Sequence, residues 1–121
     1  MRAYIFLPDT FPSLNDYIAK ERIHRLAGAK MKEEQTDRVI WQVKKMPKFK
    51  KPVTFQFTWH EKDRKRDPDN IIFAKKFILD GLKEAGIIPQ DSQKYVMGFR
   101  ESIVTNPTAP GVEILIIDED G

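Results

Sequence analysis

Residues 53–60 carry the pattern that most restricts the fold of this chain. Apolar side chains, three of them aromatic, alternate there with polar ones: Val53, Phe55, Phe57 and Trp59 against Thr54, Gln56, Thr58 and His60. Because successive side chains of a strand point to opposite faces, this alternation predicts a strand with an aromatic inner face and a polar outer face. Such a strand needs a layer packed on one side of its sheet.

Two elements are expected before this strand. Residues 1–7 predict a first strand, with most of both faces covered. Residues 13–16, Ser-Leu-Asn-Asp, are typical of a capping box, so a helix should start there. It extends as far as Lys45 with an interruption at Gly28, and its length predicts two segments.

Three elements are expected after it. A helical pattern follows Asp69 and Asn70, which are both good N-cap residues, and it ends at Gly86. Residues 95–104 and 111–117 each predict a strand, and the turn residues between them predict a hairpin.

The expected order of elements is β-α-α-β-α-β-β, an α+β fold in which helices cover a mixed sheet of about four strands. With 121 residues, the chain is long enough for one domain, residues 1–121. It has no cysteine, no segment typical of a signal peptide, and no apolar run near the roughly 20 residues that span a membrane. We therefore expect a soluble, cytoplasmic protein without disulfides.

The net charge of +3 is unevenly distributed. Residues 20–51 contain eleven Lys and Arg against four acidic residues, which favours a polyanionic partner. Within this segment, Lys48, Lys50 and Lys51 stand in a short loop bounded by prolines, and we expect them to contact DNA phosphates. An ordinary solvated helix face explains the charge about as well. Phe49 either stacks on a base or fills a gap in the core.

Asp67 and Asp69 flank Pro68. Proline restricts its own φ and keeps the preceding residue extended, so residues 67–69 are expected to form a strand end with both carboxylates on one side. Two close carboxylates with no cation between them favour a bound metal ion. Asp91 follows the end of the next helix and is a third candidate ligand. With no cysteine and two histidines in the chain, an all-oxygen ligand set predicts Mg²⁺ or Mn²⁺ rather than zinc.

Two lysines on the same helix are candidates for contact with a phosphate. Lys76 follows Asp69 by about two helical turns, so the two side chains should lie on nearly the same face. We expect Lys76 to approach a phosphate bound at the metal. Lys75 falls beside the apolar stripe of the helix and is expected to extend along apolar surface.

These residues also have a purely structural interpretation. An exposed turn followed by a helix cap explains Asp67 and Asp69 on their own. His60 is more typical of an exposed or hydrogen-bonded histidine than of a metal ligand, and Glu61 is expected to be a surface charge rather than a further ligand. A helix cap does not account for a third carboxylate, Asp91, after the helix.

Four motifs follow one another within residues 64–100: Asp67-Pro68-Asp69-Asn70, Lys76-Phe77-Ile78-Leu79-Asp80-Gly81-Leu82, Ala85-Gly86-Ile87-Ile88 and Asp91-Ser92. Their order resembles that of the RusA-type Holliday junction resolvases, a family of small dimeric endodeoxyribonucleases from phages and bacteria. The ordered set is far more specific than a single Asp-x-Asp.

The resemblance implies that Asp67, Asp69 and Asp91 are essential carboxylates that bind Mg²⁺, with Mn²⁺ as a substitute. It implies that Lys76 is the essential lysine, although Lys76 stands three residues further from Asn70 than in the usual form of the motif. It also implies a bacterial or phage-encoded homodimer that makes paired symmetric nicks in four-way DNA junctions during recombination and repair.

We therefore expect a Mg²⁺-dependent endonuclease that resolves Holliday junctions, with Arg66 among its DNA contacts. Two other functions fit the same residues: a non-catalytic DNA-binding protein whose carboxylates cap a helix, and a metal-dependent nucleotide phosphohydrolase. Only an enzyme should nick a junction when Mg²⁺ is added, and only the phosphohydrolase should be indifferent to competing junction DNA.

Overall fold

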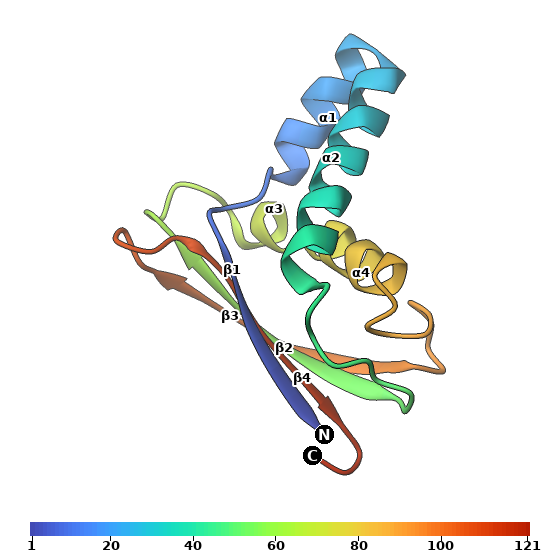
Figure 1. The fold of residues 1–121 in the computed structure, drawn as a ribbon. Coiled ribbons are helices and arrows are strands. Elements are labelled where there is room, and N and C mark those ends of the chain that lie inside the picture. The colour runs from blue at the N-terminus through green and yellow to red at the C-terminus, as the bar shows by residue number, and fades with distance from the viewer.

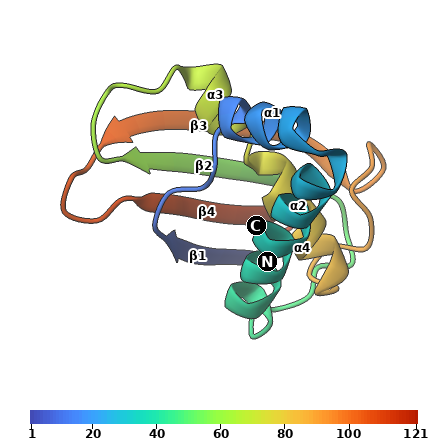
Figure 2. The ribbon, with the colours of Figure 1, turned by 90° about the horizontal axis from the view of Figure 1, so that it is seen from above.

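The fold has two layers, a four-stranded sheet and a set of helices on one of its faces (Figures 1 and 2). It is described here by a computed structural model that covers residues 1–121. The strand order is β1-β4-β2-β3, and the sheet contains both parallel and antiparallel pairs. The α+β fold with a mixed four-stranded sheet, predicted from the sequence, is confirmed.

The four strands are β1 (Arg2–Pro8), β2 (Val53–Glu61), β3 (Val96–Thr105) and β4 (Gly111–Asp118). The predicted hairpin between the last two strands is wrong, because β2 lies between β3 and β4. Strand β3 runs parallel to β2, as expected when a helical crossover joins two neighbouring strands. The chain then crosses the end of β2, where the Asn106 N–H donates to the Glu61 carbonyl at 2.6 Å.

The core lies between the helices and the inner face of β2 and β4. The inner side chains of β2 form a stack in which Phe57 lies 5.7 Å from Phe55 and 5.4 Å from Trp59, between ring centroids. All three are essentially buried, which confirms the alternation predicted for this strand. Strand β1 is covered on one face only, contrary to the prediction, and Tyr4 on its outer face is 59% exposed.

Helices α1 (Leu14–Ile23) and α2 (Arg25–Val43) form an antiparallel hairpin whose tip projects away from the sheet (Figure 1). The predicted capping box is confirmed, because the Ser13 hydroxyl accepts from the Asp16 N–H at 3.1 Å and the Asp16 carboxylate accepts from the Ser13 N–H at 2.8 Å. The break between the helices falls at His24, not at Gly28. Gly28 instead permits close packing of the pair, since a Cβ there would lie 2.5 Å from the Glu21 Cγ.

The helix expected over residues 70–85 is divided into α3 (Pro68–Ile72) and α4 (Lys75–Glu84). It begins earlier than predicted, with Asp67 as N-cap and Pro68 in the first turn. At the junction, the Lys76 and Phe77 N–H groups donate three residues back rather than four, at 3.1 and 3.0 Å, which tightens the helix locally. The predicted end is confirmed, because Gly86 has a φ of 76°, a conformation that favours glycine.

Gly81 marks the closest approach of α4 to α2, since a Cβ at this position would lie 2.5 Å from the Val39 Cβ. Gly81→Ala is therefore expected to lower the free energy of unfolding by about 1 to 3 kcal/mol, even though alanine is the better helix former. Urea unfolding measures the change. Gly98→Ala is the matched control, because nothing lies within 4 Å of a Cβ there. Equal stability of both variants would contradict this packing of α2 on α4.

Candidate active site

A cleft of about 660 Å³ lies where the loop after β2 meets the end of β3. Charged residues from the loop and apolar residues from β3 line it: Asp63, Arg64, Arg66, Asp67, Pro68, Ile71, Ile103, Val104 and Thr105. Strand β2 thus delivers the Asp67-Pro68-Asp69 motif to the rim of a cleft at one end of the sheet.

Asp67 and Asp69 stand at the start of α3. The backbone of Asp67 is extended, as Pro68 predicts, with φ −72° and ψ 151°. The expected strand end is wrong, because Pro68 and Asp69 are already helical, and the helix also removes the reason to expect both carboxylates on one side. The Asp67 side chain makes no capping hydrogen bond, and both carboxylates are exposed without an ion pair. They therefore stay available to a cation or a substrate.

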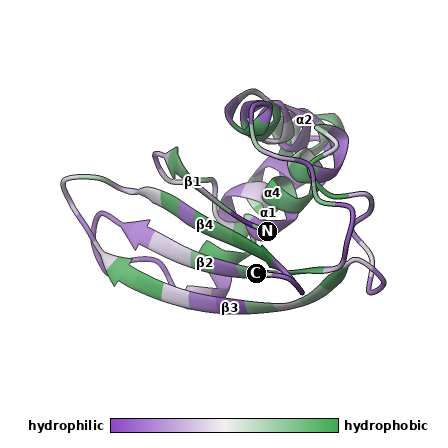
Figure 3. Ribbon diagram, turned by 60° about the horizontal axis from the view of Figure 1, so that its bottom comes forward, coloured by the Kyte–Doolittle hydropathy of each residue, from purple (hydrophilic) through white to green (hydrophobic).

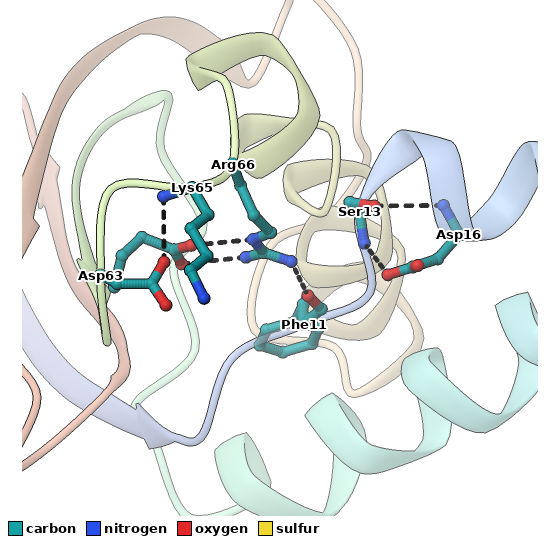
Figure 4. A network of polar contacts seen from close by, with 7 residues as sticks. Phe11, Ser13, Asp16, Asp63, Lys65 and Arg66 are labelled. Carbon is teal, nitrogen blue, oxygen red and sulfur yellow. Dashed lines mark hydrogen bonds and ion pairs between the residues drawn. The ribbon is translucent and has the colours of Figure 1, made fainter.

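Arg66 holds the loop that carries Asp67. Its guanidinium donates to both carboxylate oxygens of Glu61, at 2.8 and 2.9 Å, and to the Phe11 carbonyl at 2.7 Å (Figure 4). The Glu61 side chain is only 7% exposed, so its predicted role as a surface charge is wrong. The alternation of β2, continued by one step, was the signal that places Glu61 on the inner face. Arg66 is engaged in this pair but also lines the cleft, so its role as a DNA contact stays a prediction.

Two further hydrogen bonds hold the turn before Arg66 and the start of α3. The Asp63 carboxylate accepts from the Lys65 N–H at 2.9 Å (Figure 4). Asn70 in α3 accepts from the Asn15 N–H in α1 at 3.0 Å. These contacts attach the start of α3 to the hairpin of α1 and α2, so the two aspartates stand on a supported rather than a free loop.

The two lysines of α4 point to different partners. The Lys75 ammonium donates to Glu101 at 3.0 Å and lies 4.2 Å from the Phe99 ring centroid, as expected for a side chain extended along apolar surface. The Lys76 ammonium donates to Asp80 at 3.1 Å, away from Asp69. Because the helix is broken between Asp69 and Lys76, their spacing of two helical turns no longer predicts that they share a face. Its exposed ion pair costs little to give up, about 0.5 kcal/mol, so Lys76 remains free to turn toward a phosphate.

Asp91 lies at the other end of the sheet, in the connection between α4 and β3. That connection joins the beginning of β2, where the Val53 N–H donates to the Tyr95 carbonyl at 2.8 Å. Strand β3 has 10 residues and is about 30 Å long. Asp67 lines the cleft beside the last residues of β3, whereas Asp91 comes shortly before the first residue of β3. The structure therefore keeps Asp67 and Asp69 at the start of α3 and leaves Asp91 apart, and it contains no group of three His, Asp or Glu that could hold a metal ion.

The basic loop at residues 44–52 lies at the same end of the sheet as Asp91 (Figure 1). Lys48 and Lys50 are exposed, and neither makes an ion pair. Lys51 is bound to Asp120 and Glu119, and the hydrogen bond to Asp120 raises the pKa of its ammonium. Phe49 is buried, so its interpretation as a core residue is confirmed.

His60 is held between two side chains on the open face of the sheet. Its Nε2 lies 2.9 Å from Glu113 and its Nδ1 lies 3.2 Å from the Asn106 amide nitrogen. Because the amide can only donate there, Nδ1 accepts and Nε2 carries the proton. The prediction of a hydrogen-bonded histidine is confirmed.

Mg²⁺ typically takes one or two carboxylates and fills its other positions with water and substrate phosphates. The unpaired carboxylates of Asp67 and Asp69 are ligands of that type, and Asp67 lines the cleft, whereas the full set of three aspartates does not assemble. The pair is thus a candidate half of a metal site that DNA would complete.

The sequence matches no protein-family profile and no curated protein. None of the helices combines the length and the apolar composition needed to cross a membrane.

Proposed function

We propose that the protein is a Mg²⁺-dependent endonuclease that acts on branched DNA, with Holliday junctions as its preferred substrate. The observation that carries this proposal is the pair of exposed, unpaired carboxylates, Asp67 and Asp69, at the supported start of α3, where Asp67 lines a charged cleft. Mn²⁺ is expected to replace Mg²⁺ because both ions prefer oxygen ligands.

In this proposal, Asp67 and Asp69 hold the ion and the cleft holds the phosphodiester. The ion would supply an activated water and neutralise charge on the phosphate. Arg64 lines the cleft without an ion pair of its own and is positioned to attract the phosphate. Lys76 is proposed to exchange Asp80 for a phosphoryl oxygen, which stabilises the charge that develops in the transition state.

The five lysines of residues 44–51, with no acidic residue among them, support DNA binding at the opposite end of the sheet. We propose that Lys48 and Lys50 contact the phosphates of one arm. Lys51 can join them only by leaving Asp120, so its contribution is expected to be smaller.

The outer edge of β3 supports a homodimer. This 10-residue strand pairs with β2 on one side and with no strand on the other (Figure 3). It exposes Met97 at 65% and Phe99 at 41%, and long apolar edges of this kind tend to pair with another chain. An antiparallel pair of β3 strands related by a two-fold axis would form one continuous sheet and two symmetric sites.

Charge restricts the register of that pair. In a two-fold pair, the residue on the axis lies directly opposite the same residue of the second copy, on the same face of the sheet. An axis at Arg100 or at Glu101 would therefore place two like charges opposite each other. Pairing centred on Ser102 avoids both contacts. It places Arg100 opposite Val104 of the second copy.

The alternative of a non-catalytic protein with capping carboxylates is weakened, because the Asp67 side chain makes no capping bond. The cleft volume of about 660 Å³ lies within the range for small ligands, which keeps the nucleotide phosphohydrolase as a second candidate.

One assay tests these functions together. Purified protein is incubated with labelled four-way, Y-shaped and linear DNA, and with nucleoside triphosphates, in Mg²⁺, Mn²⁺ or EDTA. We expect paired nicks in the four-way junction with either ion and no product in EDTA. Full cleavage in EDTA contradicts metal dependence. Hydrolysis of nucleotides that is unaffected by excess junction supports the phosphohydrolase instead.

A further inference from the structure

Trp41 is 70% exposed in the last turn of α2, which is unusual for the largest apolar side chain. The other tryptophan, Trp59, is 2% exposed and belongs to the core. Packing within the chain therefore does not explain Trp41. The Lys44 ammonium lies over one face of the ring, 4.0 Å from its centroid, so the exposed ring already makes a cation–π contact.

The surroundings of Trp41 are basic. Lys44 caps the C-terminus of α2 and lies over Trp41, and the exposed Lys45 follows it in the chain. The chain then continues into the loop that exposes Lys48 and Lys50. An exposed aromatic ring beside a set of unpaired cations is the combination with which proteins bind single-stranded nucleic acid, since the ring stacks on a base and the cations contact the backbone.

We infer that Trp41 and its neighbouring lysines form a stacking platform for an unpaired nucleotide. This inference rests on the proposed action on branched DNA and adds the expectation that the bound DNA presents an unpaired base at the end of the sheet opposite the cleft. A protein partner would be expected to bring acidic groups to the same lysines, but it would not need a flat ring exposed among them. Charge and ring together favour nucleic acid.

Intrinsic fluorescence tests the platform directly, because the chain has two tryptophans and one is buried. The protein is titrated in EDTA with an oligothymidine of about 12 nucleotides, within the usual range of site sizes. We expect quenching that saturates. Trp41→Phe should abolish the quenching and keep most of the affinity, whereas Trp41→Ala should weaken binding on the order of 10-fold.

The controls separate stacking from charge and from dimerisation. Leu26→Ala changes another apolar residue, 64% exposed at the hairpin tip, and should leave binding unchanged. Replacing Lys48 and Lys50 by alanine should reduce the salt dependence, whereas Trp41→Ala should not. Sedimentation of Trp41→Ala should match that of the wild type.

Two results overturn the inference: wild-type affinity in Trp41→Ala, or dissociation of a dimer in that variant. Because the titration contains no divalent ion, it does not depend on cleavage. If the protein shows saturable quenching but cuts no DNA, the proposed nuclease activity is rejected and the stacking platform is retained. Junction cleavage without quenching rejects the platform alone.

Discussion

Asp67→Asn is expected to lower the rate of junction cleavage by at least about 10²-fold while the protein still folds and binds DNA. The amide keeps the size of the side chain but removes the charge that would hold the metal ion. The Asp67 carboxylate makes no hydrogen bond or ion pair, so the free energy of unfolding should change by less than about 0.5 kcal/mol. Binding without metal should be as tight or tighter, because one charge that repels phosphate is gone. Single-turnover cleavage, gel shift and urea unfolding on one preparation measure all three.

Asp63→Asn is the matched control, because Asp63 lines the same cleft but accepts from the Lys65 N–H, a role that the amide oxygen keeps. It should cleave at nearly the wild-type rate. Asp91→Asn then distinguishes two arrangements. A small effect supports a site built on Asp67 and Asp69. A loss as large as that of Asp67→Asn shows that Asp91 is needed, as the family resemblance implies, and that its connection moves when DNA binds.

Arg66→Ala should lower the free energy of unfolding by about 3 kcal/mol, and Tm by roughly 10 °C. The reason is that the Glu61 carboxyl group, 7% exposed, would stay in the protein interior without its partner. The Phe11 carbonyl would also lose its donor. Thermal and urea unfolding measure the change. Arg64→Ala removes the same charge from an exposed neighbour with no ion pair, and it should leave stability within about 0.5 kcal/mol of wild type.

The double variant Glu61→Leu with Arg66→Leu should recover part of the stability, since an apolar pair needs no charged partner. A different outcome would support the role expected from the sequence: if Arg66→Ala unfolds like wild type but binds junctions more weakly, then Arg66 is a DNA contact. The distinction matters for the cleft, because loss of the Glu61–Arg66 pair would release the turn that carries Asp67.

Strand β2 illustrates what short-range pattern can predict. Its alternation depends on the geometry of an extended chain, so the aromatic inner face was predictable without knowledge of any neighbour. The capping box at Ser13 and the helix end at Gly86 are equally local, because a side chain bonds a nearby N–H or a glycine permits a positive φ. The extended backbone of Asp67 follows from the ring of Pro68.

The failures have a common origin in long-range contacts. A turn between residues 105 and 111 suggests a hairpin, but β2 occupies the position between the two strands. The helix break at Phe73 occurs where this ring packs 5.4 Å from Tyr17 and 5.5 Å from Phe77, between centroids. The Phe77 contact joins residues four apart, but the contact with Tyr17 is not visible in the helical spacing of residues 70–85.

The sequence alone determined the types of the elements, the α+β class and the candidate residues, because backbone sterics, capping and periodicity act within a few residues. Tertiary structure decided which strands are neighbours and which charges are paired. It bound Glu61 to Arg66 and Lys51 to Asp120, and it left Asp67 and Lys50 unpaired. It also placed Asp91 at the far end of β3, because a crossover between parallel strands must return the chain to the end where the first strand began.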